Sequence, residues 1–272
     1  MLIANTMGLA ADKIFAMETS DIGMPLAWVG AISYTLQIYF DFSGYSDMAI
    51  GIGHILGFDF PENFKYPYVA VGIRDFWRRW HMSLTGWFRE YLYIPLGGNR
   101  KGKARQILNS MIVFTCTGIW HGANLTFLVW GFLHGVLISV ETLIEKKDKK
   151  TPKPLVPIRW LFTMFAVVLG FVIFRADTLI YGAEYIGQMF TIGEKVSGYE
   201  MLLSIVTPSY ITTAVVAVIA CCPIVPFISS MKNKKIYPVI DVLGYVGSLA
   251  LFMLCAMSLA SNSYNPFIYF RF

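Results

Sequence analysis

Three of the four histidines of the chain lie between residues 74 and 135, in a stretch rich in tryptophan and apolar side chains. They are His81, His121 and His134; the fourth, His54, lies outside this stretch and has no supporting context. An ionisable side chain within apolar sequence costs free energy unless it is paired or used, so inside a membrane protein it marks a functional site. The chemistry of this protein is therefore expected here.

His121 has the features of a general base. Gly118 and Gly122 flank it and allow a ligand or another backbone to approach closely. Asn124 is a good N-cap for the apolar segment that follows, and the positive end of that helix would keep the imidazole neutral. A neutral imidazole in a dry cavity can take the proton of an acceptor hydroxyl as its oxygen attacks a carbonyl, which is acyl transfer. The alternative is a histidine that is only hydrogen-bonded inside a helical bundle.

The other two histidines of this stretch are expected to support His121. His81 is the natural partner, which would orient the acceptor or polarise the carbonyl; alternatively its tip reaches the membrane interface between tryptophans. His134 lies four residues after Trp130 on one helix face, so packing or support of His121 is expected of it. Trp120, next to His121, is a further supporting residue.

Other chemistries lack their sequence signatures. There is no i, i+4 His/Glu pair or compact cluster for a metal, so no metal site is predicted. There is also no glycine-rich phosphate loop and no G-x-S-x-G nucleophile elbow. The nucleophile must therefore come from the substrate or from a partner.

The composition is that of an integral membrane protein. Of 272 residues, 56% are hydrophobic and 14% charged, with a mean hydropathy of +0.56. Soluble domains have about 45–50% apolar and about 25% charged residues. The net charge of +5 comes from short Lys/Arg clusters between apolar runs, which is typical of cytoplasmic loops and not of nucleic-acid binding.

Two elements precede the histidine turn. Residues 26–57 are long enough for one long or broken span, interrupted by Asp41 and Asp47; these carboxylates predict a buried polar network, a cavity lining or a structural hydrogen-bonded pair. Residues 58–73 read as an interfacial loop. Residues 75–94 then carry apolar side chains at three- and four-residue spacing and predict one amphipathic helix in the membrane interface.

The remaining segments alternate across the membrane. The apolar run 107–120 is short, breaks around His121 and is followed by 125–144, which predicts a re-entrant hairpin between two basic clusters. Further spans are expected at about 158–174, 208–229 and 239–260, with 175–205 lying flat or outside. The C-terminal NPFIYFRF is expected as an aromatic anchor on the outer face.

Four motifs resemble one family. YTLQIYFDFSGYSDMAIGIGHILGF, FWRRWHMSLTGWFREYLYIPLGGNRKG, GIWHGANLTFLVWGFLHG and NPFIYFRF together are similar to the membrane-bound O-acyltransferases. The nearest branch resembles the bacterial membrane subunits that O-acetylate alginate, peptidoglycan and other surface glycans, and more distantly the D-alanyl transfer protein of teichoic acids. The resemblance covers nearly the whole chain.

The resemblance implies an all-α, multi-pass fold in the bacterial inner membrane, with residues 1–272 in one membrane-embedded domain. A funnel from each face would meet at the catalytic histidine, which His121 matches, and His81 matches the second characteristic histidine. No tightly bound cofactor is implied; the donor would be an acyl thioester, acetyl-CoA, on the cytoplasmic side. The acetyl group would pass to a polysaccharide acceptor, often through an extracytoplasmic acetyltransferase partner.

Basic side chains near His81 would then meet the phosphates of CoA, although anchoring of cytoplasmic loops explains them equally well. They are Arg78, Arg79, Arg100, Lys101 and Arg105.

Members of this family usually carry several more spans before the matched region, so the chain is expected to correspond to the C-terminal part of such a protein. Two alternatives stay open. One is a transporter or channel whose buried Asp41, Asp47 and His121 line a pathway. The other is a non-catalytic scaffold subunit.

Overall fold

The computed structural model describes residues 1–144, 151–193, 196–230 and 237–261, and every regular element in them is helical. The expected all-α fold is therefore confirmed. The helices are α1 (Leu2–Phe15), α2 (Met24–Ile55), α3 (Ile73–Trp77), α4 (Met82–Phe88), α5 (Gly102–Trp120), α6 (Leu125–Ile144), α7 (Val156–Arg175), α8 (Leu179–Gln188), α9 (Val196–Ile205), α10 (Pro208–Ala220), α11 (Ile224–Ser230) and α12 (Tyr237–Ser261). Short 3-10 turns cover Thr19–Asp21, Pro67–Val69 and Lys153–Leu155, and a π-helical turn covers Arg89–Tyr93.

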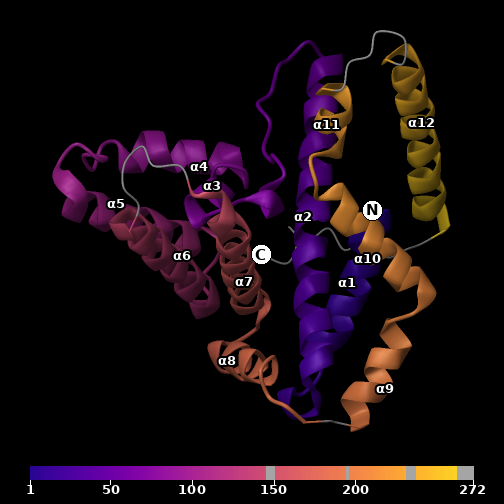
Figure 1. Cartoon of the computed structure of the whole chain (residues 1–272), viewed down its shortest axis with the longest axis horizontal. Coiled ribbons are helices and arrows are strands. Elements are labelled where there is room, and N and C mark those ends of the chain that lie inside the picture. The colour runs from indigo at the N-terminus through magenta and orange to yellow at the C-terminus, as the bar shows by residue number, and fades with distance from the viewer. Residues whose placement is uncertain (145–150, 194–195, 231–236, 262–272) are drawn as a thin grey trace.

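The long helix α2 is the axis of the fold (Figure 1). α1 packs along it, α7 packs against it, and the α5–α6 hairpin is attached through α7. Tyr185 of α8 joins this core across the chain: its ring stacks on Phe15 at 4.4 Å, and its hydroxyl donates to the carbonyl oxygen of Ala27 at 3.0 Å. The turn that carries His121 thereby rests on α1, α2 and α7.

Among the described residues, three helices are long and apolar enough to cross a membrane: Leu125–Ile144, Lys153–Arg175 and Pro238–Ala260. The spans expected at 125–144, 158–174 and 239–260 are therefore confirmed as helices of the right length. The span expected at 208–229 is wrong as one helix. It ends at Ala220, and α11 begins only after Pro223, because a proline disfavours helix at the residue before it. Instead, α9 and α10 form a pair bent by 72°.

The single amphipathic helix expected over 75–94 is also wrong. α3 ends at Trp77, α4 begins at Met82, and His81 between them has a φ of +45°, in the left-handed region. Asn63 stabilises the break from the preceding loop: its carbonyl accepts the N–H of Met82 at 2.9 Å, and its Oδ1 accepts the N–H of Ser83 at 3.1 Å. Two backbone donors that a continuous helix would bond internally are satisfied by the loop instead.

The span expected over residues 26–57 is one unbroken helix, α2, which ends at Ile55, and the loop expected after it is present. Asp41 is half-buried on α2, but Asp47 is exposed. The expectation of two buried carboxylates is therefore wrong for Asp47. The NPFIYFRF anchor and most of the Lys146–Lys153 cluster lie outside the described residues.

Glycines set the close crossing of α5 and α6. A Cβ built at Gly118 would lie 2.5 Å from the carbonyl oxygen of Phe127, and one at Gly131 would lie 3.0 Å from the Cα of Gly118 and closer still to the carbonyl oxygen of Phe114. Small residues at a helix crossing let two backbones approach in this way. The hairpin that holds His121 at its tip depends on them.

Gly131→Ala is expected to lower stability by about 2 kcal/mol, because the added methyl forces two packed backbones apart. The readout is thermal unfolding of the purified protein in detergent. Gly51→Ala is the matched control, since a Cβ at that position of α2 meets nothing within 4 Å. Equal midpoints for the two variants would contradict the close crossing.

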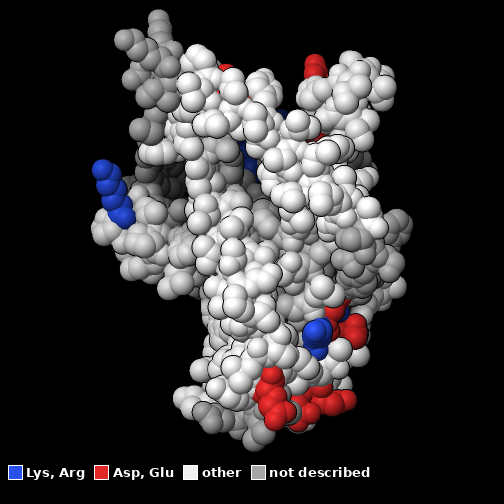
Figure 2. Space-filling view, turned by 90° about the vertical axis from the view of Figure 1, so that its right-hand side faces the viewer, with Lys and Arg blue, Asp and Glu red and all other residues white. Residues whose placement is uncertain are grey.

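Acidic side chains gather at one end of the molecule. Figure 2 shows them at the end where α1 stops and α8 lies, with a basic side chain beside them, below a largely uncharged middle, and shows fewer acidic side chains at the opposite end. The exposed Glu18 and Asp21 lie at the 3-10 turn after α1, and the exposed Glu184 lies in α8 and accepts a hydrogen bond from Thr19 at 2.7 Å. α3 and α4 lie toward the other end (Figure 1), and the arginines near them are Arg74 in α3, Arg78 and Arg79 after α3, and Arg89 after α4.

Candidate active site

His121 caps the C-terminal end of α5, in the turn that leads into α6. Its backbone N–H donates to the carbonyl oxygen of Gly118 at 3.1 Å. Three aromatic rings surround the half-buried imidazole nearly edge to face: Trp120 at 4.9 Å, Trp130 at 5.2 Å and Phe174 at 5.1 Å between ring centroids. The ring is thus fixed in an apolar cage and keeps one open side.

That open side faces a cavity of about 630 Å³. The α5–α6 turn, α2, α1 and the end of α7 form its wall. The lining residues are Asp12, Tyr34, Gln37, His121, Gly122, Ala123, Asn124, Phe127, Phe174, Arg175, Ala176 and Asp177. Because the wall includes the ends of α1 and α7, this cavity lies toward the acidic end of the molecule.

Asn124 holds the turn, as expected of an N-cap. Its Oδ1 accepts the N–H of Thr126 at 3.1 Å, and its side-chain amide donates to the carbonyl oxygen of Asp177 at 2.9 Å. The first bond satisfies a free donor of α6, and the second ties the turn to the end of α7. Gly122 has a φ of +145°, which favours glycine.

Burial keeps His121 neutral. Burial, and to a smaller extent the nearby His81, together lower the pKa of its imidazole from 6.5 to about 3. This differs from the expected cause, the positive end of α6. His121 instead ends α5, where the negative end of the helix favours the charged form, so desolvation outweighs the helix dipole.

His81 lies close to the same cage. Its ring is 8% exposed, meets Phe42 edge-on at 4.7 Å and has its Nδ1 3.3 Å from Oδ1 of Asn63. Trp120 contacts both histidines, with its ring centroid 6.1 Å from that of His81 and 4.9 Å from that of His121. Burial lowers the pKa of His81 to about 4. The structure thus brings the two predicted histidines and Trp120 together; their catalytic role stays a prediction.

Both lowered pKa values predict a loss of stability in acid. Below pH 6.5 the imidazoles of His81 and His121 bind protons in the unfolded chain but stay neutral in the folded protein. The stability that their neutral forms allow is therefore fully present above pH 6.5 and is lost as the pH falls toward about 4. The thermal midpoint of the wild type should therefore fall more steeply between pH 7 and pH 4.5 than that of a His81→Gln, His121→Gln double variant. The exposed His54, changed to glutamine, is the control and should leave the slope unchanged. Parallel slopes for wild type and double variant would contradict the burial of the two rings.

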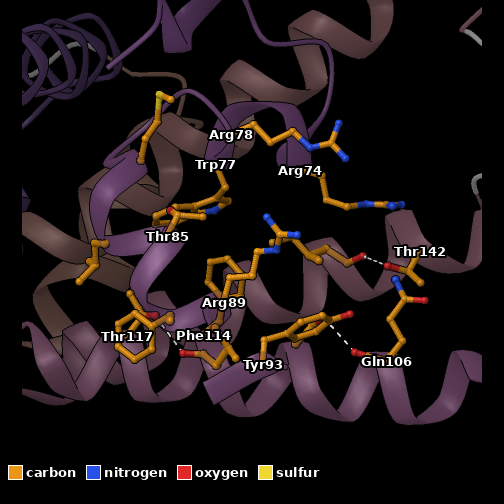
Figure 3. A pocket seen from close by; sticks show the side chains of 17 residues that line it. Arg74, Trp77, Arg78, Thr85, Arg89, Tyr93, Gln106, Phe114, Thr117 and Thr142 are labelled. Carbon is orange, nitrogen blue, oxygen red and sulfur yellow. Dashed lines mark hydrogen bonds between the residues drawn. The ribbon is translucent and has the colours of Figure 1, made fainter. Parts of the chain in front are cut away.

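A second cavity, of about 600 Å³, lies among α3, α4, the π-helical turn and α5 (Figure 3). The side chains of Arg74, Arg78 and Arg89 converge on one side of it, with Tyr93 below them. Its deeper wall is apolar and includes Trp77 and Phe114. This cavity combines a cationic rim with an apolar interior.

Aromatic side chains connect the two cavities. Trp77 lines the arginine-rich cavity and lies 5.7 Å from Trp130, whose ring in turn lies 5.2 Å from that of His121. The indole N–H of Trp77 donates to Nδ1 of His134 at 3.2 Å, and His134 is 1% exposed. His134 therefore packs behind the site and holds Trp77 in place, which agrees with the packing and support expected of it.

Of the predicted phosphate-binding residues, only Arg78 lines the arginine-rich cavity. Arg79 is paired with Asp75 at 3.0 Å, and Arg105 donates to the carbonyl oxygen of Leu96 at 3.2 Å. Arg100 and Lys101 are exposed and line neither cavity.

Sequence reasoning missed several site residues. Arg74 and Arg89 complete the cationic rim, and the only signal for them was their place at the two ends of the amphipathic stretch. Asn63, which bonds the left-handed break at His81, and Gln37, which lines the His121 cavity, carried no recognisable signal.

Asp41 and Asp47 line neither of the two cavities. In the part of the chain that the structure describes, no group of three or more histidine, cysteine or acidic side chains could hold a metal ion.

Comparison with known proteins agrees with this geometry. Residues 10–174 match the model of MBOAT, the membrane-bound O-acyltransferase family. The chain is 40% identical over 287 aligned residues to a probable alginate O-acetylase AlgI of Pseudomonas putida, with all of this chain and 58% of the relative covered. It is 45% identical over 183 residues to a peptidoglycan O-acetyltransferase of Helicobacter pylori, which covers 66% of this chain and 34% of the relative. It is also 36% identical over 145 residues to a teichoic acid D-alanyltransferase of Bacillus subtilis, covering 51% of this chain and 36% of the relative.

The chain spans less than two thirds of the length of these relatives. The family match nevertheless includes α2, both histidines of the cage and the arginine-rich elements. The protein belongs to the membrane-bound O-acyltransferase family of membrane proteins.

Proposed function

We propose that the protein transfers an acetyl group from acetyl-CoA to a hydroxyl of an extracytoplasmic polysaccharide. One observation carries the proposal: a cationic cavity and a histidine cavity lie on either side of the Trp77–Trp130 contact. The alginate and peptidoglycan O-acetyltransferases among the relatives support acetyl as the acyl group and a surface polymer as the acceptor.

The arginine-rich cavity is the proposed donor site. Acetyl-CoA carries phosphates at one end and a thioester at the other, on a mostly uncharged arm. Arg74, Arg78 and Arg89 would bind the phosphates, because guanidinium groups form charge-assisted hydrogen bonds to phosphate oxygens. The arm would then lie along the apolar wall, with the thioester toward Trp77.

His121 is the proposed general base. Its neutral imidazole takes the proton of the acceptor hydroxyl as that oxygen bonds to the acetyl carbonyl carbon. The tetrahedral intermediate then collapses, the carbon–sulfur bond breaks, and the imidazolium returns the proton to the departing thiolate, giving the acetyl ester and CoA. His81 would polarise the carbonyl or orient the acceptor; its ring and that of His121 both contact Trp120, which supports this role.

The two ends of the molecule give the proposed orientation. The basic elements would face the cytoplasm, where the donor is made, and the acidic end with the His121 cavity would face outward. The protein would thus cross the bacterial inner membrane several times and pass acetyl from one side to the other. The acceptor is reached directly or through an extracytoplasmic acetyltransferase partner.

The structure does not bring together the residues on which the transporter alternative depends. It required Asp41, Asp47 and His121 along one pathway, but Asp47 is exposed and neither carboxylate lines a cavity with His121.

Transfer of labelled acetyl from acetyl-CoA to extracytoplasmic polymer tests the proposal. The protein is expressed from its complete native reading frame, and inverted membrane vesicles expose the cytoplasmic face to the donor. Label is expected inside the vesicles, in alkali-labile ester linkage, and only when the protein is present. Label that stays in acetyl-CoA, or that appears in polymer on the donor side, would contradict it.

A further inference from the structure

Gln37 of α2 is the feature of the His121 cavity that the proposed chemistry does not use. Its side chain lines the cavity, yet the residue is only 3% exposed. Among the residues that the structure describes, its buried Oε1 has no hydrogen-bond partner. A buried polar atom without a partner costs about 1–3 kcal/mol, so natural proteins rarely keep one without a use.

The side chain is also held in place. The Nε2 of Gln37 lies against Gly8 of α1, where an added Cβ would approach it to 2.7 Å. Met7, another α1 residue in the core, is fully buried. The amide is therefore confined between two packed helices, which fixes the direction in which its oxygen can accept a hydrogen bond.

Two other polar side chains of the wall are already engaged. Arg175 donates to Asp12 at 2.9 Å, and its guanidinium lies over the rings of Phe15 and Tyr34 at 5.4 and 5.9 Å. The side chain of Asn124 accepts from the N–H of Thr126 in α6 and donates to the carbonyl oxygen of Asp177 after α7. The Oε1 of Gln37 is thus a buried acceptor of this wall that bonds no other described residue.

An attacking hydroxyl has one proton, and the proposed mechanism gives that proton to His121. A hydrogen bond to Gln37 must therefore come from a second donor on the acceptor molecule. In a sugar the nearest such donor is the neighbouring hydroxyl of a vicinal diol, which is uncharged and fits a cavity whose arginine is already neutralised by Asp12.

We propose that Gln37 is a specificity-determining residue for the acceptor: its Oε1 accepts a hydrogen bond from the hydroxyl next to the one that is acetylated. The site thereby selects vicinal diols over isolated hydroxyls. This inference rests on the proposed function, because it assigns the His121 cavity to the acceptor.

The test uses the purified full-length protein, acetyl-CoA and three acceptors. The parent is a 1,4-linked mannuronate tetrasaccharide, which has free hydroxyls at C2 and C3; the others are its 2-deoxy and 3-deoxy forms. One deoxy form lacks the attacked hydroxyl and is inactive. The other keeps it but lacks the neighbour, and wild type is expected to use it about tenfold less efficiently than the parent, because Oε1 is left unpaired.

Gln37→Leu removes the acceptor atom at similar side-chain size. The variant is expected to use the parent about tenfold less efficiently than wild type and to treat the parent and the active deoxy form alike, with an unchanged KM for acetyl-CoA. Gln37→Glu keeps an oxygen acceptor and should restore the preference for the diol. A wild type that does not distinguish the parent from the active deoxy form, or a Gln37→Leu variant that still does, would overturn the inference.

Stability provides a second readout. Since Oε1 bonds nothing in the described structure, the thermal midpoint of Gln37→Leu is expected to equal or exceed that of wild type. A clearly lower midpoint would assign Gln37 a structural role instead. A wild type that transfers acetyl to none of the three sugars would overturn the inference, because no sugar would then be the acceptor in the His121 cavity. Label that still reaches polymer in the vesicle experiment would leave the proposed function standing, so the two failures are distinguishable.

Discussion

Replacing His121 with glutamine is expected to lower acetyl transfer by about a thousandfold. Glutamine keeps a similar size and a hydrogen-bonding tip within the aromatic cage, but it cannot take the proton of the acceptor hydroxyl, and a positioned general base contributes about 10²–10⁴ in rate. The KM for acetyl-CoA should stay within about twofold, since the donor is proposed to bind in the other cavity. The measurement is initial-rate transfer of labelled acetyl by the purified full-length protein.

His54→Gln is the matched control. His54 is exposed and lies 3.1 Å from Asp59, so the same substitution there should leave transfer unchanged. Unchanged transfer in His121→Gln, at normal levels of the protein in the membrane, would make His121 structural. A protein that binds the donor but transfers no acetyl with or without His121 would support the scaffold alternative.

The His121 turn could be predicted because its signals are local. Gly118, Gly122 and Asn124 interrupt two apolar runs within a few residues, and each acts on backbone next to itself: a close crossing, a positive φ and a helix cap. The apolar runs on either side could then be assigned as α5 and α6. Short-range chemistry of this kind is readable from one sequence.

The break at His81 could not be predicted, because its cause is distant in the chain. The stretch from Asp75 to Ile94 has a helical apolar period, and a helix is what that period alone favours. Asn63, eighteen residues before His81, supplies the carbonyl and side-chain oxygens that make the left-handed turn stable. Tertiary hydrogen bonds of this kind override local propensity.

The predicted phosphate-binding residues lie only in part around the arginine-rich cavity. Arg78 and Arg79 are adjacent, and the resemblance to the family assigned both to phosphate. Arg78 lines the cavity, whereas Arg79 pairs with Asp75, four residues before it. The break at His81 lets Arg89, from after it, line the same cavity as Arg74 and Arg78, from before it.

Changing Arg78 and Arg89 together to glutamine is expected to raise the KM for acetyl-CoA about a hundredfold, with kcat within about threefold of wild type. Each charge-assisted hydrogen bond to a phosphate contributes about 1.5–3 kcal/mol, so two bonds give at least that factor. Arg74 is left unchanged, because its guanidinium Nε lies 3.5 Å from Oε2 of Glu141, and loss of this ion pair would disturb α6. The measurement is steady-state transfer at varied acetyl-CoA.

A donor without phosphates shows whether the double variant has lost phosphate binding or has lost its fold. S-acetylpantetheine carries the same thioester on a shortened arm, so wild type and the double variant should use it equally if the two arginines act only on phosphate.

The control pair Arg100→Gln and Lys101→Gln removes two exposed charges outside both cavities and should leave the KM for acetyl-CoA unchanged. If the control pair raises this KM as much as Arg78 and Arg89 do, the effect is general attraction by a basic surface, and the arginine-rich cavity is not the donor site. If only Arg78 and Arg89 raise it, and only for the phosphate-bearing donor, the broken helix at His81 has placed two cations on one ligand that a continuous helix would have kept apart.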